Sequence, residues 1–287
     1  MTPTEINAVL DRIGGKANKR LGQHFLIEER TLRAIIEAAQ IQSGDFVLEI
    51  GPGLGVLTEA LTAAGARVTA IEQDRRFVEW FALKKDSYVK SGGEVSIFHG
   101  DAARMDWMSF VHDRPWKFVS NLPYSITSLA LRKALWNTHP PERIAVLVQR
   151  EVAERAIAQD GKGSLLSLMV ALASREAKIV RRVPRGAFYP PPQVESAVLL
   201  IEPLSLHDRM ERWGIDSEKI MALAKCGFAH PRKFLFSNLK NSKSSAFETA
   251  EVQNLISGNS GIDPKARAED LTPDDWARLA KKIKFYA

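Results

Sequence analysis

The tetrad Asn121-Leu122-Pro123-Tyr124 combines a side-chain amide, a constrained backbone carbonyl and an aromatic ring. It follows the apolar run Phe118-Val119-Ser120 and precedes a helix-like segment at 126–135. In open α/β sheets, ligands bind at the carboxyl ends of the strands. An amide beside an aromatic ring at that position can hold a flat base and hydrogen-bond its exocyclic amine. The same residue types also suit an ordinary strand-to-helix turn, with Tyr124 in the core.

Glycines and acidic residues follow three predicted strands that precede the tetrad. Gly51 and Gly53, in the segment 49–55, let the chain turn sharply and let a ligand approach the backbone. Glu72 lies about 21 residues after Gly51, where a carboxylate reaches ribose hydroxyls in nucleotide-binding βαβ units. Asp101 and Ala102 end the third strand, and the carboxylate there could accept from an adenine amine. Each acid alone also suits a helix cap or a solvated loop, but the ordered set predicts an adenosine-containing cofactor.

The chemistry of the motifs narrows the choice of cofactor to S-adenosylmethionine. The chain has no G-x-x-x-x-G-K-[ST] segment, which excludes a P-loop kinase or ATPase, and no partner for hydride transfer stands out. S-adenosylmethionine carries a cationic sulfonium and ammonium, which suit the acidic surroundings, and it has no pyrophosphate. The six histidines show no metal-ligand spacing, so we expect no metal.

The elements that must position these residues alternate regularly along the chain. Apolar runs predict strands, and amphipathic segments between them predict helices. The predicted strands are 46–50, 67–71, 95–98, 117–120 and 144–148. The predicted helices are 31–40, 56–64, 74–89, 126–135, 151–158 and 165–173. This order favours an α/β protein with a parallel sheet covered by helices on both faces. Two later runs, 177–181 and 196–201, flank Phe188-Tyr189-Pro190-Pro191-Pro192 and predict an added strand pair, one of them antiparallel.

The two ends of the chain differ from this pattern. Residues 1–30 read as a polar, basic arm, and after Pro203 only helical patterns remain, at 218–228, 234–239 and 276–285. We therefore predict a domain at 1–204, which includes the arm, and a helical domain at 205–287.

Composition limits the classes of protein that the chain can form. Among its 287 residues the net charge is +6, which weakly suggests a polyanionic partner. Cys226 is the single cysteine, so no disulfide forms within the chain, as in a reducing compartment. No apolar run reaches the roughly 18 residues of a membrane span, and the amino terminus resembles no signal peptide. These features predict a cytoplasmic protein.

Four motifs together resemble the ribosomal RNA adenine dimethyltransferase family. They are the segments 22–26 (GQHFL), 49–55 (EIGPGLG), 121–124 (NLPY) and 188–196 (FYPPPQVES), and the resemblance covers the chain from about Lys16 to Leu239. It implies a Rossmann-like, seven-stranded methyltransferase sheet with a small all-helical C-terminal domain. It also implies S-adenosylmethionine as cofactor, and dimethylation of the N6 amines of two adjacent adenines near the 3′ end of small-subunit (16S) RNA, a step in small-subunit biogenesis.

The resemblance also implies roles for individual residues. The cofactor would contact His24, Leu26, Gly51, Gly53, Glu72, Asp101, Ala102 and Asn121. The family often has asparagine at the position of His24, and two arginines before Lys233, where this chain has Pro231 and Arg232. A histidine can make a similar hydrogen bond, but its protonation then matters, and Pro231 weakens the case for an RNA contact there.

For the reaction itself, we predict that the two N–H groups of the adenine amine donate hydrogen bonds to the tetrad. The acceptors would be the side-chain oxygen of Asn121 and the backbone carbonyl of Leu122. Pro123 biases Leu122 toward an extended conformation that aims this carbonyl. Tyr124 would stack on the base, and Phe188 would cover the other face unless it is a core residue. The transfer would be direct, without a covalent intermediate or a metal.

The expected partner is small-subunit ribosomal RNA or an immature small subunit, bound by a monomer. Basic residues would engage the RNA: Lys16, Lys19, Arg20, Arg181, Arg182, Arg185, Lys225, Arg232 and Lys233. Three alternatives remain open: a large-subunit RNA enzyme, which usually has isoleucine in place of Leu122; an amine methyltransferase for DNA or protein, which commonly has a second proline there; and an assembly factor in which binding outweighs catalysis.

Overall fold

The computed structural model describes residues 1–286 except 19–20, 91–92, 159–162, 243–246 and 248–260. Contacts divide the chain into two compact units, one formed by Met1–Ala153 and Glu176–Pro203 and the other by Glu154–Arg175 and Leu204–Ala287. The segment 154–175 thus groups with the C-terminal helices. The domain boundary expected after residue 204 stays a prediction.

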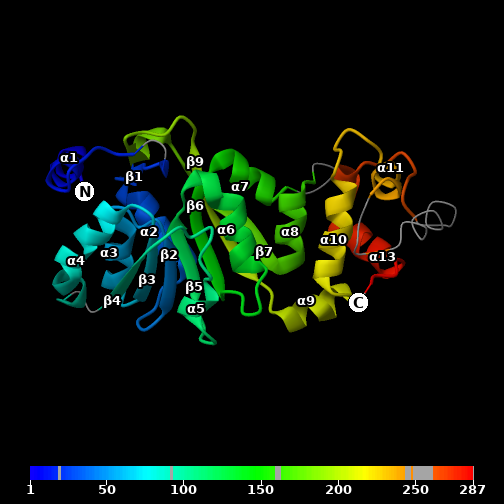
Figure 1. The fold of residues 1–287 in the computed structure, drawn as a ribbon, viewed down its shortest axis with the longest axis horizontal. Coiled ribbons are helices and arrows are strands. Elements are labelled where there is room, and N and C mark those ends of the chain that lie inside the picture. Colours follow the sequence, from blue (N-terminus) through cyan, green and yellow to red (C-terminus); the bar gives the residue numbers. More distant parts are fainter. Residues whose placement is uncertain (19–20, 91–92, 159–162, 243–246, 248–260, 287) are drawn as a thin grey trace. The chain divides into compact units, whose positions relative to one another are not determined.

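A seven-stranded mixed sheet forms the centre of the first unit (Figure 1). Its strand order is β4-β3-β2-β5-β6-β9-β7; the strands are β2 (Phe46–Ile50), β3 (Arg67–Glu72), β4 (Glu94–His99), β5 (Lys117–Asn121), β6 (Arg143–Gln149), β7 (Ser174–Val183) and β9 (Ser196–Pro203). Strands β2 to β6 pair in parallel, and β9 runs antiparallel to β6. The sheet confirms the predicted fold class and the antiparallel strand.

The order of the strands creates a crevice at the centre of the sheet. From β2 the chain moves outward to β3 and β4, and then returns to β5 on the other side of β2 before reaching β6. Ligands of doubly wound sheets bind at such a switch point, outside the carboxyl ends of the strands. The ends of β2 and β5 therefore define the expected site.

Helices bury the sheet on both faces. One apolar cluster joins Ile35 of α2 and Leu57 of α3 to Val47 and Val119 of the sheet. Phe118, which points to the opposite face, is fully buried as well and packs on Trp107. Strands buried on both faces are nearly continuous apolar runs, which explains why the sequence predicts them well. The helices of this part of the chain are α2 (Glu29–Ala39), α3 (Val56–Ala63), α4 (Arg75–Lys90), α5 (Met108–Val111), α6 (Thr127–Leu135), preceded by η2 (Tyr124–Ile126), and α7 (Arg150–Ala156).

The N-terminal segment is more ordered than the predicted arm. Helix α1 (Pro3–Arg12) begins with a capping box in which Thr2 and Glu5 bond each other's backbone, and its apolar residues pack against Phe25 and Phe77. Strand β1 (Phe25–Leu26) then pairs antiparallel with β8 (Phe188–Tyr189), which follows η3 (Arg185–Ala187). The pairing of two-residue strands so far apart in sequence has no local signal.

The second unit is helical, as predicted. It contains α8 (Leu165–Ala173), α9 (Leu206–Trp213), α10 (Ser217–Gly227), α11 (Leu235–Lys240), η4 (Ala268–Asp270) and α13 (Pro273–Lys281). Helix α10 packs against α8, α11 and α13. The sequence prediction omitted α9, although Ser205 caps it by accepting from the Asp208 amide. Within the described residues, no helix has the length and apolar character needed to cross a membrane.

Candidate cofactor and catalytic site

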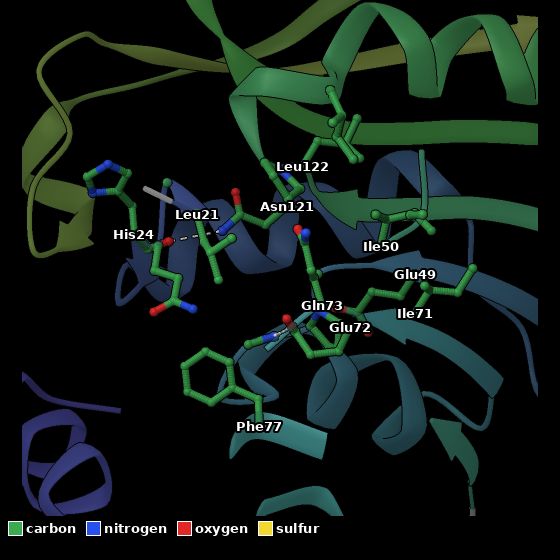
Figure 2. Close-up of a pocket in the computed structure, with 18 of the residues that line it drawn as sticks. Leu21, His24, Glu49, Ile50, Ile71, Glu72, Gln73, Phe77, Asn121 and Leu122 are labelled. Carbon is green, nitrogen blue, oxygen red and sulfur yellow. Dashed lines mark hydrogen bonds between the residues drawn. The ribbon is translucent and has the colours of Figure 1, made fainter. Parts of the chain in front are cut away.

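A cavity of about 350 Å³ lies at the carboxyl ends of the central strands. Figure 2 shows side chains that border it, among them His24, Glu72 and Asn121. The cavity brings together every residue predicted for the site except Phe188: His24, Leu26, Gly51, Gly53, Glu72, Asp101, Ala102, Asn121, Leu122 and Tyr124. They come from both sides of the switch point and from β1.

The glycine turn after β2 is held close to the tetrad and to β1. Gly51 has φ +68° and Gly53 has φ +57°, backbone conformations that residues other than glycine rarely adopt. A Cβ on Gly51 would lie 3.1 Å from Pro123 Cγ, and one on Gly53 would lie 3.3 Å from the Phe25 ring. The turn therefore needs glycine both for its backbone conformation and for the narrow space.

Two buried carboxylates border the cavity. Glu72 accepts from the backbone amides of Gly53 at 3.0 Å and Asp74 at 2.8 Å, and burial raises its pKa. Glu49, on β2, accepts from the Thr58 hydroxyl at 2.7 Å, and burial raises its pKa to about 8. Ionising either group costs free energy unless a cation is near. The sequence prediction did not include Glu49, although a single acid inside an apolar strand was a visible signal.

The loop after β4 is fixed by hydrogen bonds to its own backbone and to α6. Asp101 accepts from the Ala103 amide at 2.9 Å. Lys133 of α6 donates to the carbonyls of Ala102 at 3.2 Å and Met105 at 2.6 Å. Because α6 follows the tetrad directly, Lys133 connects the two sides of the cavity. The sequence gives no local reason to select this lysine.

The orientation of the Asn121 amide follows from its neighbour. Asn121 Nδ2 donates to the backbone carbonyl of His24 at 3.3 Å, the dashed line in Figure 2. A carbonyl can only accept, so the amide nitrogen must face it. The Asn121 oxygen is therefore left to accept a hydrogen bond from a ligand. Leu122, next in the chain, donates its backbone amide to the Leu147 carbonyl at 3.1 Å, which fixes the tetrad to β6.

Two aromatic rings stand at the same part of the cavity. The Tyr124 hydroxyl bonds the Ser196 hydroxyl at 2.7 Å, and burial raises its pKa, which keeps the phenol neutral. The His24 ring lies nearly parallel to that of Tyr124, with 25° between the planes and 6.1 Å between the centroids. His24 Nδ1 bonds the Pro190 carbonyl at 2.8 Å.

A charged cluster ties the segment before β1 to the end of β3. Asp74 accepts from Gln23 Nε2 at 2.8 Å and from the Arg76 guanidinium at 2.6 and 3.0 Å. Hydrogen bonds from Arg76 hold the pKa of Asp74 below its usual value. Arg76 also donates to the Lys16 carbonyl at 3.3 Å. These contacts tie Gln23 and Lys16 to the end of β3, and the sequence prediction did not include Asp74.

The structure places Phe188 away from the cavity lining. Its side chain is 2% exposed and belongs to the apolar cluster that also contains Leu26, its partner in the β1–β8 register. Burial of an aromatic ring stabilises this contact between β8 and the sheet. The sequence predicted that the ring lies on a Pro-stiffened loop, with core packing as the alternative, because no local pattern indicates the pairing of β1 with β8. The stacking role of Phe188 stays a prediction.

The basic residues predicted to contact RNA have varied surroundings. Arg181 donates to Glu28 and Thr31 of the α2 region, both at 3.1 Å. Arg185 donates to the Pro192 carbonyl at 2.7 Å. Two others, Lys19 and Arg20, lie outside the described residues. At least two of the predicted basic residues thus also stabilise the fold.

Solved structures of other proteins share this fold. A dimethyladenosine transferase structure from Plasmodium falciparum matches with a TM-score of 0.71 and 25% identity, over 92% of this chain and all of that one. A structure of the 23S rRNA methyltransferase ErmE matches with a TM-score of 0.64 and 25% identity, over 90% of this chain and 99% of that one. The fold is that of a Rossmann-like methyltransferase.

The sequence comparisons identify the family. The model of the family described as ribosomal RNA adenine dimethylase matches residues 14–284. The ribosomal RNA small subunit methyltransferase A of Dehalococcoides mccartyi is 37% identical, over 92% of this chain and 87% of its own. The protein of the same name from Lactiplantibacillus plantarum is 34% identical, over 98% and 95%. The chain belongs to the ribosomal RNA adenine dimethylase family.

Proposed function

We propose that this enzyme transfers methyl groups from S-adenosylmethionine to the N6 amines of two adjacent adenines near the 3′ end of small-subunit ribosomal RNA. The observation that carries the proposal is the Asn121 amide, whose oxygen is oriented for an amine donor beside an acid-lined cavity. The relatives named small subunit methyltransferase A support the choice of RNA. We further propose that the protein acts as a monomer in the cytoplasm and contributes to small-subunit biogenesis.

The residues present fit S-adenosylmethionine. The glycine turn has narrow space beside its backbone, into which a Cβ would intrude. Glu49 and Glu72 are buried carboxylates whose raised pKa values indicate that a cation would stabilise their ionised forms. His24, Leu26, Gly51, Gly53 and Glu72 would hold the cofactor, together with Asp101, Ala102 and Asn121. When bound, it supplies an electrophilic methyl group on its sulfonium.

The tetrad would prepare the adenine amine for attack. The amine is a poor nucleophile because its lone pair is delocalised into the ring. Its two N–H groups would donate hydrogen bonds to the Asn121 oxygen and the Leu122 carbonyl. This arrangement would favour a pyramidal nitrogen whose lone pair is directed at the methyl group. Tyr124 would stack on the base, at about 1–3 kcal/mol per aromatic contact, which offsets the cost of unstacking. Orientation of the reacting groups would supply much of the rate.

The test is incubation with labelled S-adenosylmethionine and undermethylated small subunits, followed by mapping of the labelled nucleotides. We expect label on two adjacent adenines of the small-subunit RNA. Undermethylated large subunits are the matched control, and label there would favour the large-subunit alternative. Labelling of DNA or protein in place of RNA would also contradict the proposal. Binding to the subunit should weaken steeply with salt, because phosphate contacts release counterions.

Substitution of Lys133 by methionine tests the brace between α6 and the loop after β4. We expect S-adenosylmethionine to bind about tenfold more weakly, because two hydrogen bonds from a charged donor are lost at the Ala102 and Met105 carbonyls. Titration calorimetry measures the affinity, and thermal unfolding checks that the fold is retained. Arg33→Met, at a position 63% exposed, is the control. Equal affinities in both variants would show that Lys133 does not position the loop.

Substitution of Phe188 by leucine separates its two possible roles. From its burial we expect turnover and cofactor affinity to be retained, with a loss of stability of about 1 kcal/mol. Denaturant unfolding and steady-state methylation measure the two effects. A loss of turnover with unchanged stability and unchanged cofactor affinity would instead establish the stacking role predicted from the sequence.

A further inference from the structure

The segment 188–196, one of the four motifs of the family resemblance, ends in a serine that has no role in the proposed reaction. Ser196 is the first residue of β9 and is fully buried. A hydroxyl that is removed from water costs free energy unless it finds a hydrogen-bond partner. Among the described residues, the partner of the Ser196 hydroxyl is the hydroxyl of Tyr124, at 2.7 Å and 72 positions away. The end of this motif thus contacts the tetrad directly.

The backbone at Ser196 is fixed to the carboxyl end of β6 by the antiparallel β6–β9 register. Glu195, just before it, accepts from the Arg150 amide at 2.9 Å, and the side chains of the two residues form an ion pair. The tetrad is attached to the same strand, because the Leu122 amide donates to the Leu147 carbonyl. A serine oxygen is placed by a single torsion, so this fixed backbone leaves the hydroxyl few positions.

Tyr124 is anchored at both ends of its side chain. Its backbone lies in η2, where the Ile126 amide donates to the Pro123 carbonyl at 3.1 Å. Its hydroxyl is held by Ser196. A tyrosine side chain turns about two torsions, and fixing both ends restricts both of them. The ring borders the cavity, so it presents a surface that is oriented before a base arrives and loses little conformational entropy when one binds.

We infer that Ser196 is a positioning residue for the methyl transfer, because its hydroxyl fixes the orientation of the Tyr124 ring on which the target adenine stacks. This inference rests on the proposed function, in which Tyr124 contacts the base. Ser196 is fully buried, and the residues that line the described cavity include Tyr124 but not Ser196. Its effect on the reaction therefore passes through the Tyr124 hydroxyl.

The experiment is a double-mutant cycle of Ser196→Ala and Tyr124→Phe, which remove the two partners of one hydrogen bond without adding volume. Single-turnover methylation of undermethylated small subunits gives the rate of transfer, and titration calorimetry gives the affinity for S-adenosylmethionine. We expect each single variant to lower the rate about fivefold, as for the loss of one hydrogen bond, at unchanged cofactor affinity. The double variant should be no slower than either single variant.

Ser174→Ala is the matched control for the loss of a buried hydroxyl. Ser174 is also buried, and its hydroxyl donates to the Val170 carbonyl at 2.7 Å, within the second unit. Urea unfolding should show a similar loss of stability in Ser174→Ala and Ser196→Ala. Only Ser196→Ala should transfer methyl groups more slowly.

Other outcomes would overturn the inference in identifiable ways. A wild-type rate in Ser196→Ala would show that the hydrogen bond stabilises the fold alone. Additive losses of rate in the double variant would show that Ser196 acts independently of Tyr124. A loss of cofactor affinity in Ser196→Ala would place its effect at the cofactor. Inactivity of the wild type on small subunits would instead refute the proposed function itself.

Discussion

Replacement of Asn121 by alanine is expected to lower kcat by about 100-fold or more, the usual effect of removing one hydrogen-bonding group that acts on the reacting atoms. The variant loses the oxygen that accepts from the adenine amine, whereas the His24 carbonyl and the Leu122 backbone remain. Single-turnover methylation with labelled S-adenosylmethionine measures the rate of transfer. The affinity for the cofactor should change by less than tenfold, because the buried carboxylates stay in place.

Asn241→Ala is the matched control, because this asparagine is exposed in the second unit and bonds within its own helix end, to the Ser237 carbonyl at 2.7 Å. It should methylate at the wild-type rate. A near-normal rate in Asn121→Ala would refute the proposed mechanism. If the inactive Asn121→Ala protein still rescued small-subunit assembly in cells, the alternative of an assembly factor would gain support.

The affinity for S-adenosylmethionine is expected to rise with pH and to level off above about pH 8. Burial raises the pKa of Glu49 to about 8, so the carboxyl carries a proton at neutral pH in the absence of a cation. A cationic ligand favours the ionised form, so binding below this pH releases the proton. The affinity should therefore increase by up to about tenfold per pH unit below pH 8. Calorimetry in two buffers with different ionisation enthalpies measures the released protons.

The stability of the protein without cofactor should show the opposite dependence. The pKa of Glu49 in the folded state, about 8, lies above its ordinary value of 4.5, so the folded state binds this proton more tightly. The contribution to the free energy of unfolding is therefore fully present below pH 4.5 and is lost as pH rises toward 8.

Glu49→Gln should remove the contribution of Glu49 to both pH dependences and should be more stable than the wild type at pH 8, since the amide keeps an acceptor for Thr58 without the buried charge. Urea unfolding at several pH values measures the stability. Glu79→Gln changes a carboxylate that is 67% exposed and serves as the control. If Glu49→Gln and the wild type kept the same stability difference at pH 5 and pH 8, the raised pKa would be wrong.

The sheet of this protein could be predicted because each of its central strands contains a short, mostly apolar run. The run at Phe46–Ile50 is buried on both faces, and the turn that follows it has positive φ values that favour glycine. Similar boundaries follow the next strands, where Glu72 and Asp101 occur. Residues that follow the strands can be assigned to one site from the sequence, because the carboxyl ends of parallel strands lie at the same edge of the sheet.

Other parts of the site depend on contacts between distant residues. Lys133 reaches the carbonyls of Ala102 and Met105, and Gln23 reaches Asp74 from 51 positions away. No periodicity or motif marks such pairs. Helix α1 is a different case, because Thr2 and Glu5 form its capping box, a local signal that the sequence prediction did not use.

The sequence by itself determined the family of the protein, its α/β sheet and its helical C-terminal region. It also selected ten residues that the structure places around one cavity, since these depend on residue types at strand ends. Only the tertiary structure decided the position of the eleventh predicted residue, Phe188, and the surroundings of His24. The two-residue pairing of β1 with β8 buries Phe188 and brings the Pro190 carbonyl to His24. The reason is physical: antiparallel register between segments some 160 residues apart follows from the packing of the whole unit and not from any local preference.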